Sequence, residues 1–125
     1  RKISLIKKKK LKFLNLWGNG KARRELIYVD DLADACIYFM KKKAKHNLIN
    51  IGTGKDQTIS YFAKKFLKIL IPEKKILIKY DTSKPNGTPR KVLDVSLAKK
   101  YGWKARSNFQ KSIIDTYNSF TKKNI

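Results

Sequence analysis

Residues 24–40, RELIYVDDLADACIYFM, combine a strand pattern with a helix pattern, the two patterns on which the fold depends. The first half predicts a β-strand that leads directly into a helix. Asp30 or Asp31 is placed to cap that helix. Apolar residues then recur at helical spacing and predict one buried stripe, made of Leu32, Ala35, Cys36, Phe39 and Met40. The lysines at 41–43 predict the end of the helix, because cations suit a helix C-terminus.

The same alternation of strand and helix continues on both sides of this stretch. Strands are predicted at residues 12–17, 47–54 and 75–81, and helices at 1–10, 58–70, 96–101 and 108–122. Thr58 and Ser96 are candidate helix caps, and Gly102 a helix end. The last helix is predicted to bury a face made of Phe109, Ile113, Tyr117 and Phe120. An α/β domain is therefore favoured over an all-helical or all-β one.

The chain has 125 residues and a net charge of +22, from 31 basic and 9 acidic residues. Such a charge suggests a polyanion as partner. However, 26 of the 31 are lysines spread along the chain, whereas a nucleic-acid reader more often concentrates arginine. We therefore expect no specific nucleic-acid partner. A single cysteine and the lack of a ~20-residue apolar run predict a cytoplasmic protein without a membrane span.

The sequence offers no catalytic or metal-binding constellation. His46 lies in a lysine-rich turn, and Cys36 is expected to pack on its helix. Two such residues cannot form a zinc site. The aspartates of the 30–34 segment are interpreted as helix caps and dipole partners.

The stretch NIGTGKDQT, residues 50–58, imitates a phosphate-binding loop. A dinucleotide fingerprint needs a third glycine where Gln57 stands, and a Walker A loop needs Ser or Thr where Asp56 follows Lys55. The stretch is therefore interpreted as a structural turn without a cofactor.

Two basic loops remain as candidate anion sites. Trp17 precedes a Gly-Asn-Gly turn, and Arg24 lies seven residues after Trp17. The second loop, TSKPNGTPRK at 82–91, is stiffened by two prolines and carries Lys84, Arg90 and Lys91. An aromatic face with a guanidinium suits a nucleotide base, sugar or diphosphate. The alternative is a solvated turn and a core tryptophan, and the residues alone leave both open.

The ordered combination of WGNGKARRELIYVDDLADACIYFM, NLINIGTGKDQTI and DTSKPNGTPRKVLDVSLAKKYGW shifts the balance towards an anion site. It resembles the C-terminal part of the GDP-L-fucose synthase family, the GDP-4-keto-6-deoxy-D-mannose 3,5-epimerase/4-reductases among the extended short-chain dehydrogenases. The resemblance runs from Arg1 to about residue 122. VDDLADA is shared by many nucleotide-sugar enzymes, whereas WGxGxxxRE with DTSKPxGTPRK is much more specific.

The resemblance implies a substrate-binding lobe for the GDP-sugar, without the Rossmann core. Family substrate contacts match Lys2, Trp17, Arg24 and Lys91, together with Asn86, where the family usually has aspartate. Lys2 stands where arginine is frequent and lacks its planar fork. Asn86 lacks the anionic acceptor but keeps an amide.

The resemblance also implies what a complete enzyme would contain elsewhere. NADP(H) would be bound by an N-terminal Rossmann domain, which would also carry the catalytic residues, and the full-length enzyme would be a homodimer. Because the chain starts at Arg1 without a helix-start signal, it is expected to be a fragment that is inactive alone. Another nucleotide-sugar epimerase or dehydratase, or a basic polyanion-binding domain, are the alternatives.

Overall fold

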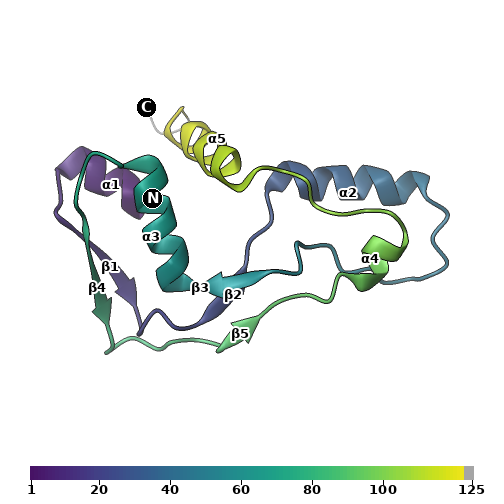
Figure 1. Ribbon diagram of the computed structural model, residues 1–125, viewed down its shortest axis with the longest axis horizontal. Coiled ribbons are helices and arrows are strands. Elements are labelled where there is room, and N and C mark those ends of the chain that lie inside the picture. Colours follow the sequence, from purple (N-terminus) through teal and green to yellow (C-terminus); the bar gives the residue numbers. More distant parts are fainter. Residues whose placement is uncertain (123–125) are drawn as a thin grey trace.

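The computed structural model describes residues 1–122, which form five helices and five short strands (Figure 1). In chain order these are α1 Lys2–Lys9, β1 Phe13–Trp17, β2 Arg23–Glu25, α2 Val29–Lys41, β3 Asp56–Thr58, α3 Ile59–Leu70, β4 Leu77–Asp81, β5 Arg90–Lys91, α4 Ser96–Lys100 and α5 Phe109–Lys122. The predicted α/β class is confirmed.

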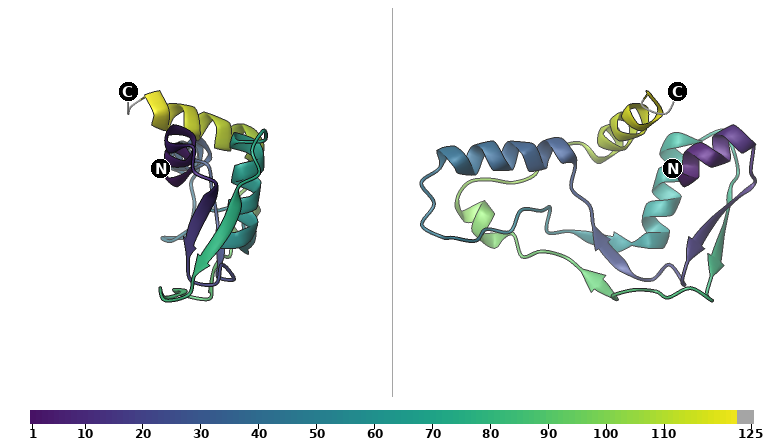
Figure 2. Two further views of the ribbon diagram at one scale, coloured as in Figure 1. Left: turned by 90° about the vertical axis from the view of Figure 1, so that its left-hand side faces the viewer. Right: turned by 180° about the vertical axis from the view of Figure 1, so that it is seen from behind.

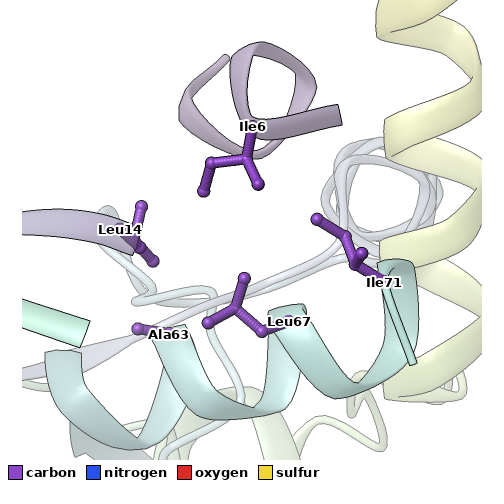
Figure 3. Packing of buried hydrophobic residues seen from close by; sticks show 5 residues of the cluster. All are labelled: Ile6, Leu14, Ala63, Leu67 and Ile71. Carbon is purple, nitrogen blue, oxygen red and sulfur yellow. The ribbon is translucent and has the colours of Figure 1, made fainter. Parts of the chain in front are cut away.

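One hydrophobic core lies between α1, α3 and the parallel pair β1 and β4 (Figure 3). Ile6 of α1 and Ile71, just after α3, are its most deeply buried large side chains. Leu14 enters from β1, and Ala63 and Leu67 from α3. The apolar spacing along α3 thus gives this end of the molecule its stability.

A second, smaller core joins α2 to α4 at the other end of the molecule (Figure 1). Ala35, Ala98 and Trp103 are its buried members. Asp34 accepts a hydrogen bond from the Trp103 indole at 2.9 Å, so the ring keeps a polar partner where it is buried. The two cores are separate clusters, and the strands between them carry the connection.

Two distant segments, residues 13–25 and 77–91, run side by side from the first core towards the second (Figure 1). They pair in parallel as β1 with β4, separate into two loops, and pair in parallel again as β2 with β5. β3 adds to the other edge of β2 in antiparallel orientation, which gives the strand order β3-β2-β5. We call this arrangement the double track.

Helix α5 lies across the top of α3 and α1, and the molecule is thin when seen from the side (Figure 2). Phe109, at the start of α5, stacks on Phe62 and Phe66 of α3 with ring centroids 6.1 Å apart. Lys7 of α1 places its ammonium 5.2 Å from the ring centroid of Tyr117. These contacts anchor α5 over the first core.

Several predicted helix ends are confirmed. The Thr58 hydroxyl accepts the Tyr61 amide at 3.0 Å and caps α3. Gly102 follows α4 with a φ of +92°, in the left-handed region that glycine tolerates. The capping role of Ser96 is wrong, because Ser96 is already helical and its amide donates to Asp94.

The strand and cap predicted for residues 24–31 need correction. β2 ends at Glu25, and α2 begins after Tyr28, which is its N-cap without a side-chain hydrogen bond. Asp31 instead accepts the amides of Arg106 and Ser107 and ties α2 to the α4–α5 connection. Its cap role is therefore wrong, although its place in the first turn still suits the helix dipole.

The buried strand predicted at residues 47–54 does not form within the described chain. Leu48 is 80% exposed, and Ile49 and Ile51 contact the second core only from its edge. A strand needs a hydrogen-bonded neighbour. No described segment pairs with residues 47–51, which explains why their apolar pattern was misleading.

The predicted apolar stripe of α2 is only partly buried. Ala35 is fully buried and Phe39 packs on the second core. Leu32, Cys36 and Met40 are exposed, so the packing role predicted for Cys36 is wrong. The predicted face of α5 is likewise only half-buried, because Phe109 remains 39% exposed.

Candidate functional site

The site is built where β1 and β4 end. Because these strands are parallel, the turn after Trp17 and the loop after Asp81 leave from the same edge, where α/β folds usually bind ligands. The Gly18 amide donates to the Asp81 carbonyl at 2.8 Å. Asn86, in the second loop, accepts the Asn19 amide through Oδ1 at 2.7 Å. These two hydrogen bonds lock the loops together.

Gly18 is required at this junction for two reasons. Its φ is +71°, in the left-handed region that other residues rarely adopt. A Cβ at this position would also meet the Asn86 side chain and lie 3.0 Å from the Asn86 Cα. The glycine therefore allows the two loops to approach each other.

Trp17 is the exposed aromatic surface of the site. Its side chain is 66% exposed at the end of β1, so the alternative of a core tryptophan is excluded. Lys2, at the start of α1, donates to the Asn15 carbonyl at 2.7 Å and holds its ammonium 5.9 Å from the Trp17 ring centroid. The indole and this cation could together receive a flat, negatively charged ligand.

Arg24 joins β2 to the second loop. Its Nη1 donates to the Thr88 carbonyl at 2.7 Å and to the Arg23 carbonyl. Within the described chain its Nε and Nη2 have no acceptor, so this edge of the guanidinium is available for an anion. Arg24 and Lys2 both line a cavity of about 480 Å³ that is otherwise mostly apolar.

Lys91 lies beside Arg24 on the neighbouring strand. β5 pairs with β2 so that Arg24 is opposite Lys91 and Arg23 is opposite Arg90. Directly opposed residues of paired strands project to the same face. The ladder therefore places the guanidinium and the ammonium on one face of the double track.

On the other face, Arg23 and Arg90 share one carboxylate. Asp56, at the start of β3, accepts Nε of Arg23 at 2.9 Å and Nε of Arg90 at 2.6 Å. Its side chain is only 6% exposed. The hydrogen bonds from Arg90 and then Arg23 hold the Asp56 pKa well below its usual value, so this group stays charged.

The glycine turn at 52–54 is filled by a side chain of the chain itself. The Glu25 carboxylate accepts the amides of Thr53, Gly54 and Leu93, the last two at 2.7 and 2.8 Å. Burial raises the Glu25 pKa, but these hydrogen bonds together outweigh burial and leave the pKa lowered. The amides that could cradle a phosphate are thus already occupied.

This geometry bears on cofactor binding by the described chain. A dinucleotide-binding loop must direct its amides towards the ligand's diphosphate. The turn at 52–54 directs them to Glu25 instead, so this turn does not fit the diphosphate of NADP(H).

The groups considered for catalysis are placed apart from the double track. His46 Nδ1 lies 2.7 Å from the hydroxyl of Tyr101, which also accepts the Lys45 amide, near the second core. Cys36 is exposed on α2. Among residues 1–122, no group of three or more His, Cys, Asp and Glu side chains could hold a metal ion.

The structure brings the sequence-predicted site residues together in two pairs and one link. Lys2 lies beside Trp17, Arg24 lies beside Lys91, and Asn86 binds the turn that follows Trp17. Within residues 1–122, no hydrogen bond, ion pair or ring contact joins the first pair directly to the second. The convergence of all five on one ligand therefore stays a prediction.

Sequence reasoning missed the supporting carboxylates Asp56 and Glu25. The signal available was their scarcity. With 9 acidic residues among 31 basic ones, an acid beside a strand in this chain is more informative than a lysine. Both acids are used to fix the strands that carry the predicted site.

Within residues 1–122, no helix is long and apolar enough to cross a membrane.

Comparison with known proteins shows which family the chain is similar to. The family model described as "NAD dependent epimerase/dehydratase family" matches residues 1–52. Probable GDP-L-fucose synthase 1 of Oryza sativa subsp. japonica is 36% identical over 102 residues, which cover 82% of this chain and 30% of that protein. A GDP-L-fucose synthase of Sinorhizobium fredii is 32% identical and covers 96% of this chain and 38% of that one. The chain thus spans about a third of the length of the curated relatives it matches.

Solved structures agree with this result. GDP-mannoheptose C4 reductase from Campylobacter jejuni, solved with NADP bound, matches with a TM-score of 0.73 and 28% identity over 94% of this chain and 40% of that one. UDP-N-acetylglucosamine 4-epimerase from Methanobrevibacter ruminantium was solved in complex with UDP-N-acetylmuramic acid. It matches with a TM-score of 0.81 and 25% identity, over 97% of this chain and 38% of that one. Both the sequence and the fold of this chain are therefore similar to those of the NAD-dependent epimerase/dehydratase family of extended short-chain dehydrogenases, and named GDP-L-fucose synthases are among the similar proteins.

Proposed function

We propose that this chain is the substrate-binding lobe of a GDP-L-fucose synthase and grips the nucleotide end of the GDP-sugar. The observation that carries the proposal is the double track, whose two loops and second ladder present Trp17, Arg24 and Lys91 along one continuous structure. The similarity to named GDP-L-fucose synthases supports the choice of GDP.

Each residue has a distinct part in this proposal. The exposed Trp17 ring offers a face for a flat base, with the Lys2 cation above it. Arg24 and Lys91, on neighbouring strands, would bind the diphosphate. Asn86 would act mainly by holding its loop against the Gly18–Gly20 turn, since its Oδ1 is already bonded to Asn19. This explains how an amide serves where the family usually has a carboxylate.

The reaction would take place in a larger assembly. The substrate-binding lobe would orient GDP-4-keto-6-deoxy-D-mannose for 3,5-epimerisation and for reduction at C4 by NADPH, which supplies hydride when bound. NADP(H) and the catalytic residues would belong to a Rossmann domain outside this chain, which alone would be inactive. A homodimeric, cytoplasmic full-length enzyme is part of the same proposal.

The outer face of α2 supports the idea of a missing neighbour. Val29, Ile37 and Met40 are 66%, 55% and 85% exposed, and Cys36 and Leu32 are also exposed. Large exposed apolar patches mark surfaces that another body covers. We propose that the nucleotide-binding domain of the complete enzyme packs here.

Base preference tests the proposed ligand most simply. Saturation-transfer NMR on the chain with GDP-mannose, UDP-glucose and a dTDP-sugar should show transfer to the guanine and ribose protons of GDP-mannose. The other two nucleotides, at equal concentration, should give much weaker transfer. Equal transfer to all three would contradict guanine selectivity.

A second candidate is a related enzyme that acts on a UDP-sugar. It is favoured by the structural match to an epimerase solved with UDP-N-acetylmuramic acid. Stronger transfer to UDP-glucose than to GDP-mannose would support it. The diphosphate-binding part of the site would then stand, while the assignment of the base would be wrong.

A polyanion-binding role is a third candidate, motivated by the net charge of +22. Nonspecific affinity for DNA falls steeply with salt because binding releases counterions. GDP-mannose held by stacking and hydrogen bonds should retain a larger part of its affinity between about 50 and 200 mM salt. A chain that retains DNA but not GDP-mannose at the higher salt would favour the polyanion role.

A further inference from the structure

Asp56 lies in β3, an edge strand of its sheet, and its carboxylate has an unusually complete set of hydrogen-bond partners. Its carboxylate accepts Nε and Nη2 of Arg23 at 2.9 and 3.3 Å, and Nε and Nη2 of Arg90 at 2.6 and 3.2 Å. Its carbonyl oxygen accepts Arg23 Nη2 at 2.9 Å. The carboxylate is 6% exposed, whereas the two arginine side chains are 41% and 62% exposed. One buried acid therefore joins three strands, β3, β2 and β5.

The two arginines immediately precede the two cations of the proposed site. Arg23 is followed by Arg24 in β2, and Arg90 is followed by Lys91 in β5. Side chains alternate between the two faces of a strand. The Asp56 clamp on one face therefore fixes the register in which Arg24 and Lys91 meet on the other.

β5 needs such a clamp because it is very short. It contains two residues, and its ladder to β2 joins only two residue pairs. The preceding loop contributes one further backbone bond, from the Arg23 amide to the Pro89 carbonyl, and one side-chain bond, from Arg24 to Thr88. Without Asp56, two guanidinium groups would face each other across this ladder with no charge between them.

We propose that Asp56 is a positioning residue of the nucleotide-sugar site, which holds β5 against β2 so that Arg24 and Lys91 bind the same diphosphate. The inference rests on the proposed function and adds a residue that does not itself touch the ligand. Its effect on binding runs through Arg23 and Arg90.

The sign of the effect separates positioning from simple electrostatics. Replacing Asp56 by asparagine makes the region more positive, so a purely electrostatic effect would strengthen the binding of an anionic diphosphate. If Asp56 instead positions the strands, its replacement lets β5 separate from β2 and weakens the binding of the diphosphate. The two accounts therefore predict opposite changes in affinity.

The experiment measures GDP-mannose affinity by isothermal titration calorimetry for the wild-type chain and for Asp56→Asn. We expect the variant to bind about tenfold more weakly, with the far-UV circular dichroism of the wild type. Glu73→Gln is the matched control. It removes one negative charge from the exposed turn between α3 and β4, where the described chain shows no hydrogen bond or ion pair for Glu73, and its affinity should not change.

A double variant tests the mechanism itself. In Asp56→Asn/Arg90→Gln the facing positive charges are gone, so we expect the affinity to recover to within about threefold of wild type. If Asp56 only contributed hydrogen bonds to the fold, removal of a second bonded side chain would not restore binding. Unchanged or tighter binding by a folded Asp56→Asn variant overturns the proposal, as does a double variant weaker than the single one.

Two other outcomes are also decisive. If Asp56→Asn does not fold, Arg90→Gln alone keeps the Asp56–Arg23 pair but loses the link to β5, and should bind about threefold more weakly. Wild-type affinity in that folded variant overturns the proposal. A wild-type chain that does not bind GDP-mannose overturns the proposed function first, and with it the role of Asp56.

Discussion

At the scale of single residues, two carboxylates organise a strongly basic chain. Asp56 and Glu25 lie opposite each other in the β2–β3 ladder. The charge of each is stabilised differently, that of Asp56 by two guanidinium groups and that of Glu25 by hydrogen bonds from backbone amides. Neither carboxylate binds the proposed ligand. Both instead fix the backbone that carries the cations of the site.

These carboxylates predict a specific pH dependence of stability. The pKa values of Glu25 and Asp56 are lower in the folded chain than their usual values of 4.5 and 3.8. Their contribution is therefore fully present above those values and is lost as the pH falls through the folded-state values. Urea unfolding monitored by circular dichroism should show the free energy of unfolding decreasing from about pH 5 to about pH 2.

Replacement of Glu25 tests the glycine turn at 52–54, whose backbone amides bind the Glu25 carboxylate. Glu25→Gln keeps the size but loses the charge that three amides and the Thr53 hydroxyl bind, so the free energy of unfolding should fall by about 1–2 kcal/mol at neutral pH. Its pH dependence below about pH 5 should also be flatter. A variant as stable as wild type, with the same acid dependence, would show that the hydrogen bonds between Glu25 and the glycine turn do not contribute to stability.

Gly18 tests the junction of the two loops. Gly18→Ala forces a Cβ into the left-handed region and against Asn86. We expect a loss of about 1–2 kcal/mol in the free energy of unfolding, and weaker binding of GDP-mannose. Gly87→Ala is a useful comparison, because it has a similar φ of +70° but meets only the end of the Arg24 side chain, at 3.4 Å. Equal effects of the two variants on binding would argue against the Gly18–Asn86 contact.

At the scale of elements, local signals predicted the helices better than the strands. α1, α3 and α5 form where apolar spacing indicates them, and α3 also begins at the predicted capping residue Thr58. β2 and β5 are short, and residues 47–51 are not a strand, because strands depend on partners that a sequence does not display. The pairing of residues 13–25 with 77–91 joins segments far apart in sequence, and no periodicity could predict it.

The site was predicted to a similar degree. The resemblance predicted Trp17, Arg24 and Lys91 as binding residues, which stays a prediction, and the structure places the last two on paired strands. It did not reveal that Asn86 bonds to Asn19, or that Asp56 joins three strands. Such contacts depend on the register between strands, which only the folded structure defines.

The exposed face of α2 gives a prediction about its thiol. Cys36 lies on that face, although its helical spacing suggested burial. A thiol reagent such as DTNB should label Cys36 of the native chain within about tenfold of its rate in urea, because no folding barrier protects it. Labelling that requires unfolding would mean that the face is covered, for example by a second copy.

At the scale of the whole molecule, charge is the dominant feature. Two small cores must hold together a chain with a net charge of +22. Mutual repulsion of the lysines opposes the compact state and is screened by salt. Raising NaCl from about 20 to about 300 mM should therefore raise the thermal unfolding midpoint. A midpoint that falls with salt would show that attractive pairs, such as those of Asp56, dominate the balance.

The central claim is that the double track binds the diphosphate of a GDP-sugar through Arg24 and Lys91, and calorimetric titration of GDP-mannose tests it most directly. The wild-type chain should bind, and Arg24→Ala and Lys91→Ala should each weaken binding at least about tenfold, as expected for loss of a charge-assisted contact. Lys100→Ala, an exposed control in the last turn of α4, should leave the affinity unchanged. Wild-type affinity in both folded site variants would contradict the claim.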